Sequence, residues 1–600
     1  MAEKIVSPGV FTRENDLSFI QAGVEAIGGA IVGPTARGPV LVPTEVNTYA
    51  EFVQIFGESY ESGSSTYQFF TSIAAKEYLK HNSPLTVCRV AGDSVSKASA
   101  SFSGSTTPLT NGVPSVEESG SGGSEIAFQI KTIGEGANLN SIGTNIEGTN
   151  NVLASGSKNN FRWEISGVNT AKGTFNLLIR RGDDTSKRKV ILEQFNGLTM
   201  DPNDANYVGS RVGTQELTVR GDATDGYYLQ PTGSYPNKSK YIFIDESTIS
   251  NIPNYLDENG TITATAKADS GSKFPGTSSG SFTGGADDYT HPMKFYSDIS
   301  DSNVQGLVPN TDAKGKNAYT KALGLLTNPD EFDINVLACP GLVHEGNYAS
   351  TLIDTSLIEA VENRGDCIAV VDPVYYNKSI ANATTEAAEV DSSYAAMYWP
   401  WVQIPNAVLG NYIWVPQSTL IPAVYAQSDA LAHEWFAPAG LNRGGLDIAI
   451  QAERKLTHAN RDTLYENNVN PIATFPGEGV VVFGQKTLQK KSSALDRVNV
   501  RRLLINLKKF ISGVSKFLVF ENNTAATRNR FLAQVEPYMQ TVQEQQGLYA
   551  FRVQMDDLNN TPDVIDRNQM KGAIFIQPAK AAEFIIIDFN ILPTGATFDD

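Results

Sequence analysis

Few side chains in this sequence stand at spacings that could catalyse a reaction. Gly276–Gly280 (GTSSG) matches the G-x-S-x-G pattern of a nucleophilic serine, whose chemistry needs a strand before the serine and a helix after it. A Gly/Ser-rich stretch surrounds this serine, so such an elbow is not expected. His433-Glu434 lacks the second histidine, four residues after the first, of a zinc-binding helix. We predict neither a catalytic serine nor a zinc protease centre.

Phosphate and cation sites are also weakly signalled. Gly315-Lys316 lacks the glycine-rich loop that cradles phosphate, and Gly134-Glu-Gly136 has Leu139 where a dinucleotide motif needs its third glycine. Asp183-Asp184 and Asp287-Asp288 offer cation ligands, but such pairs are more typical of turns. We therefore predict no catalytic residue, no cofactor site and no enzyme.

The histidines and cysteines share no metal-ligand spacing, so no metal site is predicted. We interpret the histidines as surface or capping residues, and the cysteines as buried small hydrophobic residues of a reducing compartment. These residues are His81, His291, His344, His433 and His458, and Cys88, Cys339 and Cys367.

The chain has 600 residues, which is the length of about four average domains. Hydrophobic residues make up 41% and charged residues 19%, which excludes wholesale disorder. The formal charge of −18 disfavours general nucleic-acid binding. No apolar run approaches the ~20 residues of a membrane span, and Met1–Val10 lacks a signal-peptide core. We expect folding in a cytoplasm.

Strand and helix patterns alternate before residue 93 and after residue 310, as in an α/β sheet. A loop is expected at Pro340-Gly341, and the aromatic run Tyr394–Val402 is expected in a core. The expected strands are Ala26–Val32, Leu85–Val90, Phe332–Leu337, Cys367–Val371 and Val480–Phe483, and the expected helices are Thr66–His81, Ala318–Thr327 and Ala349–Asn363. We predict that both parts form one sheet domain, interrupted by an insert.

The stretch between the two parts is rich in turns and short β-type runs. Residues 93–125 hold 15 Gly or Ser in 33 residues without apolar periodicity, and residues 257–288 are similarly loose, so both are interpreted as linkers or surface loops. Short strands are expected at Phe161–Ile165, Thr174–Ile179, Lys189–Leu192 and Lys240–Ile244. The insert is therefore predicted to be a β-rich domain.

The last third combines two amphipathic helices with short strands. Apolar residues recur at helical spacing in Arg497–Phe520 and Thr527–Gln546. Strands are expected at Phe551–Val553, Gly572–Ile576 and Glu583–Leu592.

Two features of this chain suggest assembly. The apolar, β-branched run Phe584–Leu592 is either the last strand of its own domain or a strand that pairs with a neighbouring subunit, and Ile5–Thr12 has the same ambiguity. Residues 486–530 carry eleven Lys or Arg against two acids. They form either a solvated helix face or a contact face for an acidic partner; nucleic acid is disfavoured because no aromatic residues interleave with the charges.

Short motifs occur in a characteristic order along the chain. They are Val6–Phe11 (VSPGVF), Gly33–Pro39 (GPTARGP), Phe195–Val208 (FNGLTMDPNDANYV), Phe282–Asp287 (FTGGAD), Ala395–Val402 (AAMYWPWV), Val415–Ala426 (VPQSTLIPAVYA), Phe436–Leu441 (FAPAGL), Asn470–Ile472 (NPI) with Gly484–Leu488 (GQKTL), and Val498–Leu503 (VNVRRL). Their order and number resemble the tail sheath proteins of contractile-tailed bacteriophages, especially T-even-like myophages. Pro422 and Phe436 depart from the family's usual residues.

The resemblance implies α/β and α+β core domains formed from both chain ends, with an inserted sandwich-like β domain. The implied segments are an N-terminal arm (1–22), a conserved α/β sheath domain (23–92 plus 310–480), an outward-facing insert (93–309), an inner C-terminal domain (481–580) and a C-terminal arm strand (581–600).

The resemblance also implies which residues contact other subunits. Arm strands that pair with neighbouring subunits would include Val6, Val10, Phe11, Phe584, Ile585, Ile586, Ile587, Phe589 and Ile591. Basic residues that could face an acidic inner tube are Arg501, Arg502, Lys508, Lys509 and Lys516.

The implied function is that of a contractile sheath. Subunits would self-assemble into stacked hexameric rings around the tail tube, with baseplate and tail terminator proteins as further partners. They would rearrange from a metastable extended lattice to a contracted one, driving the tube through the host envelope for genome ejection. Neither nucleic-acid binding nor membrane insertion is implied. The protein would reside in the virion tail after assembly in the host bacterial cytoplasm.

Other interpretations stay open. One is the sheath of a headless contractile device, such as a tailocin or a type VI-like system, although the large insert favours a phage. Another class is an α/β enzyme or a surface-binding protein with a β-sandwich domain. An enzyme would need a Ser/His/acid or metal cluster that the spacing does not reveal.

Overall fold

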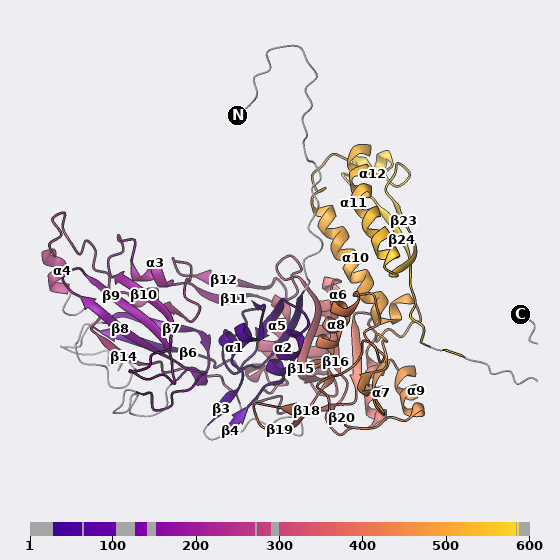
Figure 1. The fold of residues 1–600 in the computed structure, drawn as a ribbon. Helices are drawn as coiled ribbons and strands as arrows, with labels where there is room; N and C mark the ends of the chain where they lie inside the picture. Colours follow the sequence, from indigo (N-terminus) through magenta and orange to yellow (C-terminus); the bar gives the residue numbers. More distant parts are fainter. Residues whose placement is uncertain are drawn as a thin grey trace, which may run out of the picture.

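The computed structural model describes residues 28–62, 65–103, 126–140, 152–269, 273–289, 299–583 and 585–586. The chain forms three parts: a β-rich insert, a central α/β part, and a helical C-terminal part that rises from the far end of the central part (Figure 1). The prediction of a mixed α/β chain with several sheets is confirmed. Among the helices so described, none combines the length and the apolar composition needed to cross a bilayer.

A single eight-stranded sheet forms the centre of the molecule. In spatial order its strands are β2 (Thr44–Val46), β5 (Leu85–Arg89), β1 (Gly28–Gly33), β15 (Ile334–Val343), β16 (Ile368–Asp372), β17 (Ala395–Trp399), β21 (Val469–Phe475) and β22 (Gly479–Val482). β1 pairs in parallel with β5 on one side and with β15 on the other, so residues before 93 and after 310 share this sheet. Only the edge strands β2 and β22 run antiparallel to their neighbours.

Helices and a small second sheet cover the central sheet, because β1, β15 and β17 are buried at every position and need cover on both faces. The helices are α1 (Tyr49–Phe56), α2 (Phe70–Tyr78), α5 (Lys316–Leu325), the π-helix η5 (Ala349–Ile358), α6 (Glu359–Arg364), α7 (Ile380–Glu389), α8 (Ile421–Leu431) and α9 (His458–Glu466). The second sheet contains β18 (Val402–Asn406), β19 (Asn411–Val415) and β20 (Gln451–Ala452). Trp399 and Trp401 are buried in the core, as predicted.

Three local predictions for the central part are corrected. The helix expected from Thr66 is shorter, because β4 (Ser65–Tyr67) pairs with β3 (Tyr60–Ser62) before α2 begins. Pro340-Gly341 lies inside β15 rather than in a loop. The register with β16 shifts between Ala338 and Val343, so the backbone N–H that proline lacks is not required for pairing there. The segment after Ala349 starts as a π-helix before it becomes α-helical.

The insert contains two sheets and a hairpin. One sheet has the order β13 (Ile242–Ile244), β7 (Ile126–Glu135), β6 (Lys97–Ser103); the other has the order β10 (Ile191–Thr199), β9 (Thr174–Arg181), β8 (Phe161–Asn169), β14 (Ser278–Ser281); the hairpin joins β11 (Glu216–Asp222) and β12 (Gly226–Thr232). Two short helices are α3 (Val208–Val212) and α4 (Ala264–Asp269). Phe102 of the first sheet meets Trp163 of the second edge-to-face, with ring centroids 4.6 Å apart, so the sheets pack against each other.

Part of the stretch predicted to be a loop is therefore a strand. Ala98, Ala100 and Phe102 alternate along β6 and are all buried. Their period of two is that of a half-buried strand, although alanines carry the pattern only weakly.

A buried ion pair joins the insert to the central part. Arg89, at the end of β5, lies 2.7 Å from Asp287, and both side chains are almost fully buried. Arg89 also donates to the backbone oxygens of Gly38 and Glu135. Asp287, predicted as a plain turn acid, is therefore a structural partner. Asp184 is likewise buried, against Arg180.

Two long helices and a two-stranded sheet form the C-terminal part. α10 (Val498–Lys516) and α11 (Ala525–Glu544) pack through one apolar cluster with β23 (Leu548–Gln554) and β24 (Ala573–Pro578). Val498 and Ile505 of α10 belong to the central core, whereas Leu507 and Val514 belong to the C-terminal cluster. The short helix α12 (Pro562–Asp566) lies between β23 and β24 in sequence.

Candidate assembly surfaces and a histidine cluster

The two-stranded sheet of the C-terminal part has open outer edges. β23 and β24 pair with each other, and neither has another strand partner within the described residues. Phe551 and Ile576 pack towards the apolar cluster, whereas Tyr549 and Phe575 are 64% and 57% exposed. Open edges beside exposed aromatic residues are able to accept a further strand.

The segment after β24 is tethered to the subunit through the side chain of Glu583. Glu583 accepts hydrogen bonds from Arg497 at 2.7 Å and from Gln485 at 3.0 Å. Burial alone would raise the pKa of Glu583, but the hydrogen bonds from Arg497 and Gln485 outweigh it and lower the pKa. Beyond this anchor, Ile585 and Ile586 are 79% and 86% exposed. These two are the predicted arm residues that the structure describes, and they are not in a strand.

The other predicted arm residues lie outside the described residues. They are Val6, Val10, Phe11, Phe584, Ile587, Phe589 and Ile591.

Two of the predicted tube-facing residues are buried inside the subunit. The Arg501 guanidinium lies 4.0 Å from the Tyr394 ring centre, and burial lowers the pKa of Arg501. Arg502 forms an ion pair with Asp429 of α8 at 2.5 Å and is 4% exposed. Burial raises the pKa of Asp429, because desolvation outweighs the attraction of Arg502. Arg501 and Arg502 therefore connect α10 to the central part, and a partner could not reach them in this conformation.

The three lysines of α10 differ in their exposure. Lys509 is 9% exposed and forms ion pairs with Asp333 and Asp366, and it also donates to the Ile334 backbone oxygen at 2.6 Å. Lys516 is 67% exposed and pairs with Asp330, which is itself exposed, at 2.7 Å. Lys508 is exposed and donates to the Tyr394 hydroxyl at 3.0 Å. Of the predicted set, Lys508 and Lys516 thus remain accessible to a partner.

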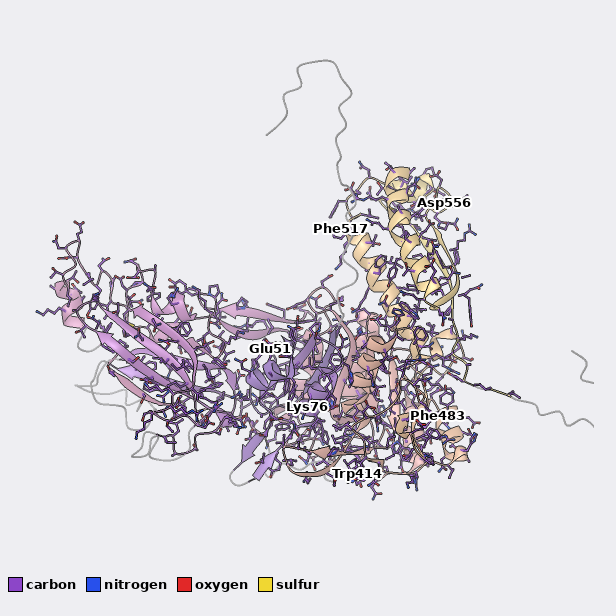
Figure 2. The ribbon with its side chains drawn as sticks, in the orientation of Figure 1. Glu51, Lys76, Trp414, Phe483, Phe517 and Asp556 are labelled. Atoms are coloured by element: carbon purple, nitrogen blue, oxygen red, sulfur yellow. The ribbon has the colours of Figure 1, made fainter. Side chains whose placement is uncertain are left out.

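An apolar tip follows the end of α10. Phe517, Val519 and Phe520 are 67%, 60% and 104% exposed, and Phe517 lies on the side of the C-terminal part that is labelled in Figure 2. The sequence predicted a helix through Phe520, but α10 ends at Lys516.

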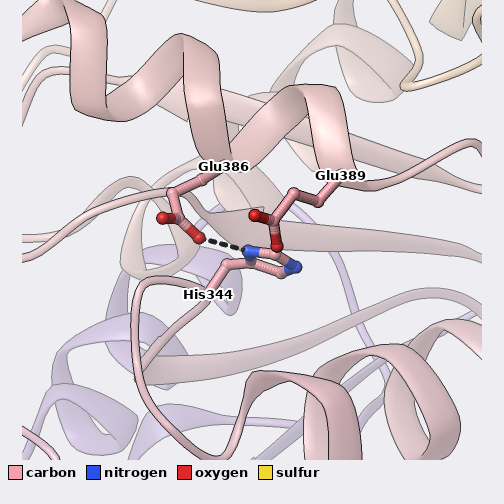
Figure 3. Close-up of side chains that lie close together, drawn as sticks. All are labelled: His344, Glu386 and Glu389. Carbon is pink, nitrogen blue, oxygen red and sulfur yellow. Dashed lines mark hydrogen bonds and ion pairs between the residues drawn. The ribbon is translucent and has the colours of Figure 1, made fainter.

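One histidine that was predicted to be a surface or capping residue is buried in a polar cluster (Figure 3). His344 follows β15, and its Nδ1 lies 2.8 Å from Glu386 Oε2 of α7. Its Nε2 lies 3.2 Å from Asp354 Oδ1 of η5. Burial alone would lower the pKa of His344, but the hydrogen bonds to Asp354 and Glu386 outweigh burial and raise it. Glu389, one turn after Glu386, brings a third carboxylate to this group.

The structure also describes the serine motif and two further histidines. Ser278 and Ser279 lie in β14, which pairs antiparallel with β8, so the strand–turn–helix of a nucleophilic serine is not formed at this motif. His433 stacks on Trp435, with ring centroids 4.6 Å apart. His458 is exposed and pairs with Asp462 one turn later on α9.

Two family models match the second half of the chain. The model of the phage tail sheath protein central domain matches residues 313–488, and that of the phage tail sheath C-terminal domain matches residues 490–591. The matched C-terminal domain contains the open-edged β23–β24 sheet and the anchored segment that follows it.

Curated relatives carry the same description. The tail sheath protein of Vibrio phage KVP40 is 33% identical over 307 residues, which cover 47% of this chain and 46% of the relative. That of Enterobacteria phage T4 is 35% identical over 297 residues, which cover 47% of this chain and 45% of the relative. The chain thus matches just under half the length of these relatives.

A solved structure extends the likeness in fold to most of the chain. The crystal structure of a sheath tail protein from Listeria innocua has a TM-score of 0.50 and 12% identity, covering 93% of this chain and 96% of that one.

Proposed function

We propose that this chain, whose residues 313–488 and 490–591 match the models of two phage tail sheath domains, is the subunit of a contractile phage tail sheath. The role is structural and not enzymatic. The named relatives come from phages, which favours a phage tail over a headless contractile device.

One observation carries the proposal furthest. The C-terminal domain combines an open-edged, two-stranded sheet with a following segment that is tethered at Glu583 and exposes Ile585 and Ile586. The sequence that continues from these two isoleucines is apolar and β-branched, which suits it to complete the β23–β24 sheet of another copy. The N-terminal residues Ile5–Thr12 supply a second apolar segment of the same kind.

Strand exchange of this type explains how a sheath remains connected while it changes shape. Head-to-tail contacts that do not close generate a helical tube. In contraction the subunits rotate and move outwards as nearly rigid bodies, while the exchanged strands keep neighbours joined. New contacts between subunits release the energy. A gain of a few kcal/mol per subunit is enough to drive contraction, because this free energy is multiplied over every copy in the lattice.

The partners follow from this role. Copies of the chain form stacked hexameric rings around the tail tube, between a baseplate and a tail terminator. Lys508 and Lys516 are the candidate contacts to an acidic tube surface. The assembled sheath belongs to the virion tail and forms in the host bacterial cytoplasm.

Electron microscopy of the purified chain tests the proposal. Concentrated wild-type protein is expected to form hollow striated tubes or ring stacks in negative stain. Deletion of residues 584–600, or the double substitution I585D-I586D, is expected to leave folded single particles, because the exchanged strand is lost or charged.

A control places a negative charge on another exposed apolar residue. Leu217, in the insert hairpin, is 45% exposed, and L217D is expected to assemble like the wild type. Undiminished tubes from I585D-I586D would refute strand exchange by the C-terminal arm. Single particles from the wild type at every concentration would refute the sheath assignment itself.

A further inference from the structure

We propose that His344, Glu386 and Glu389 form a binding site for a divalent transition-metal ion, with Zn²⁺ as the expected occupant. One ligand atom from each residue lies within 4.8 Å of the others. An imidazole nitrogen with two carboxylate oxygens is a donor set of the kind that zinc takes in proteins, with water completing the coordination. The site is independent of the proposed sheath function.

The first argument is convergence from elements distant in sequence. His344 follows directly after β15, and its backbone N–H donates to the Asp372 backbone oxygen of β16 at 2.9 Å, which holds the residue in place. Glu386 and Glu389 are three residues apart on α7, so both carboxylates project from one face of the helix. In Figure 3 the Glu386 carboxylate lies beside Nδ1, and the Glu389 carboxylate lies above the imidazole ring.

The second argument is the partner of the other ring nitrogen. His344 Nε2 lies 3.2 Å from Asp354 Oδ1. A metal-ligating histidine characteristically donates its second N–H to a carboxylate, which fixes the tautomer that presents the free nitrogen to the metal. A bound ion would displace the proton from Nδ1, which lies 2.8 Å from Glu386, while Nε2–H would continue to donate to Asp354.

The third argument is the local charge. Three carboxylates, from Asp354, Glu386 and Glu389, surround one imidazole. Both glutamates stand near the C-terminal end of α7, where the helix dipole disfavours negative charge, and the last turn of α7 contains no basic residue. A divalent cation would neutralise this excess.

The burial of the three ligands provides both an enclosed centre and an entry path. The His344 side chain is 0% exposed and that of Glu386 is 18% exposed, whereas Glu389 is exposed. An ion would reach His344 past Glu389. Once bound, it would connect the end of β15 to the last turn of α7 and, through Asp354, to η5.

Metal titration of the full chain tests the site. Equilibrium dialysis against ZnCl₂ is expected to give one equivalent of Zn²⁺ per wild-type chain. E386Q and E389Q are each expected to weaken binding at least tenfold, and the double variant E386Q-E389Q to abolish it. D354N is expected to weaken binding 10- to 100-fold, as loss of a supporting carboxylate does. Co²⁺ should give a ligand-field absorption band that is lost in the double variant.

The control is a histidine–carboxylate pair that lacks the further ligands. His458 and Asp462 are exposed and lie 2.8 Å apart on α9; H458A is expected to keep the full equivalent of Zn²⁺. Because Glu389 is exposed, E389Q should remain folded, and its unchanged melting curve without metal would establish this. The proposal is overturned if the wild type takes up no Zn²⁺, if E386Q-E389Q binds as the wild type does, or if binding is lost in H458A instead.

Discussion

At the scale of single residues, the junction between the insert and the central part contains one fully buried ion pair. Arg89 and Asp287 have side-chain exposures of 0% and 1%, and Asp287 also accepts a hydrogen bond from the Ala137 backbone N–H at 2.9 Å. Removing one member of such a pair leaves the other charge buried without compensation.

Substitution D287A is therefore expected to lower the free energy of unfolding by about 3–5 kcal/mol. The matched control is D183A, because Asp183 pairs with Arg181 in a position where both side chains are partly exposed; its cost should stay below about 1 kcal/mol. Urea unfolding followed by fluorescence measures both. Equal effects of the two substitutions would contradict the importance of the junction.

A second residue gives the protein a dependence on pH. Asp372, at the end of β16, is buried and accepts a hydrogen bond from the Ser418 backbone N–H at 2.9 Å. Burial raises its pKa from 3.8 to about 7, although the hydrogen bonds from Ser418 oppose the shift. The folded protein thus keeps this carboxyl neutral over a pH range in which the unfolded chain ionises it.

The contribution of Asp372 to stability is therefore complete below about pH 4 and decreases as the pH rises towards 7. At ~1.4 kcal/mol per pKa unit, the loss amounts to at most about 4 kcal/mol. We expect D372N to lack this decrease, because asparagine does not ionise. The melting temperature of D372N, relative to that of the wild type, should therefore rise between pH 4 and pH 8. A difference that does not change with pH would exclude the effect, and D447N, at an exposed aspartate, serves as the control.

At the scale of elements, α10 holds the C-terminal part to the central part by several charges. Lys509 is 9% exposed and contacts Asp333, Asp366 and a backbone oxygen, whereas its neighbour Lys508 is exposed and donates to one tyrosine hydroxyl. K509M is expected to reduce the free energy of unfolding by about 1–3 kcal/mol, and K508M by less than about 1 kcal/mol. Urea unfolding of both variants compares them; a larger effect of K508M would contradict the assignment.

Elements with strong apolar patterns could be predicted from the sequence, whereas contacts between side chains far apart in the sequence could not. The helices α10 and α11 lie close to their predicted places because apolar residues recur along one face of each. The strands β1, β5, β15 and β16 lie close to theirs because each is a short, mostly apolar run. β6 escaped prediction because alanines carry its alternation. The π-helical start of η5 has no sequence signature in the apolar spacing.

The candidate sites were predicted less completely, for a related reason. His344 and Glu386 are 42 residues apart, and Arg89 and Asp287 are 198 residues apart, so no local spacing reveals either pair. The basic composition of 486–530 was visible in the sequence, but which lysines and arginines turn inwards depends on the packing of α10 against α8 and the strands.

At the scale of the whole molecule, exposed charge on the C-terminal part is available for a tube contact. K508E-K516E is expected to reduce co-sedimentation of the chain with its cognate tail tube protein, because a positive surface facing an acidic partner becomes negative. Lys509 is left unchanged, since its loss would disturb the subunit itself. The control K187E-R188E makes the same charge change in the insert. If both double variants co-sedimented equally well, the proposed contact of Lys508 and Lys516 with the tube would be contradicted.

The course of α10 has a mechanical consequence. The helix is 19 residues long, about 28 Å, and its side chains enter the apolar cores at both of its ends. A helix whose two ends are packed into separate apolar cores transmits torque between them and does not act as a hinge. A twist applied to the C-terminal part would therefore turn the central sheet with it, and any compliance of an assembled lattice would have to reside in the tethers that cross from one copy to the next.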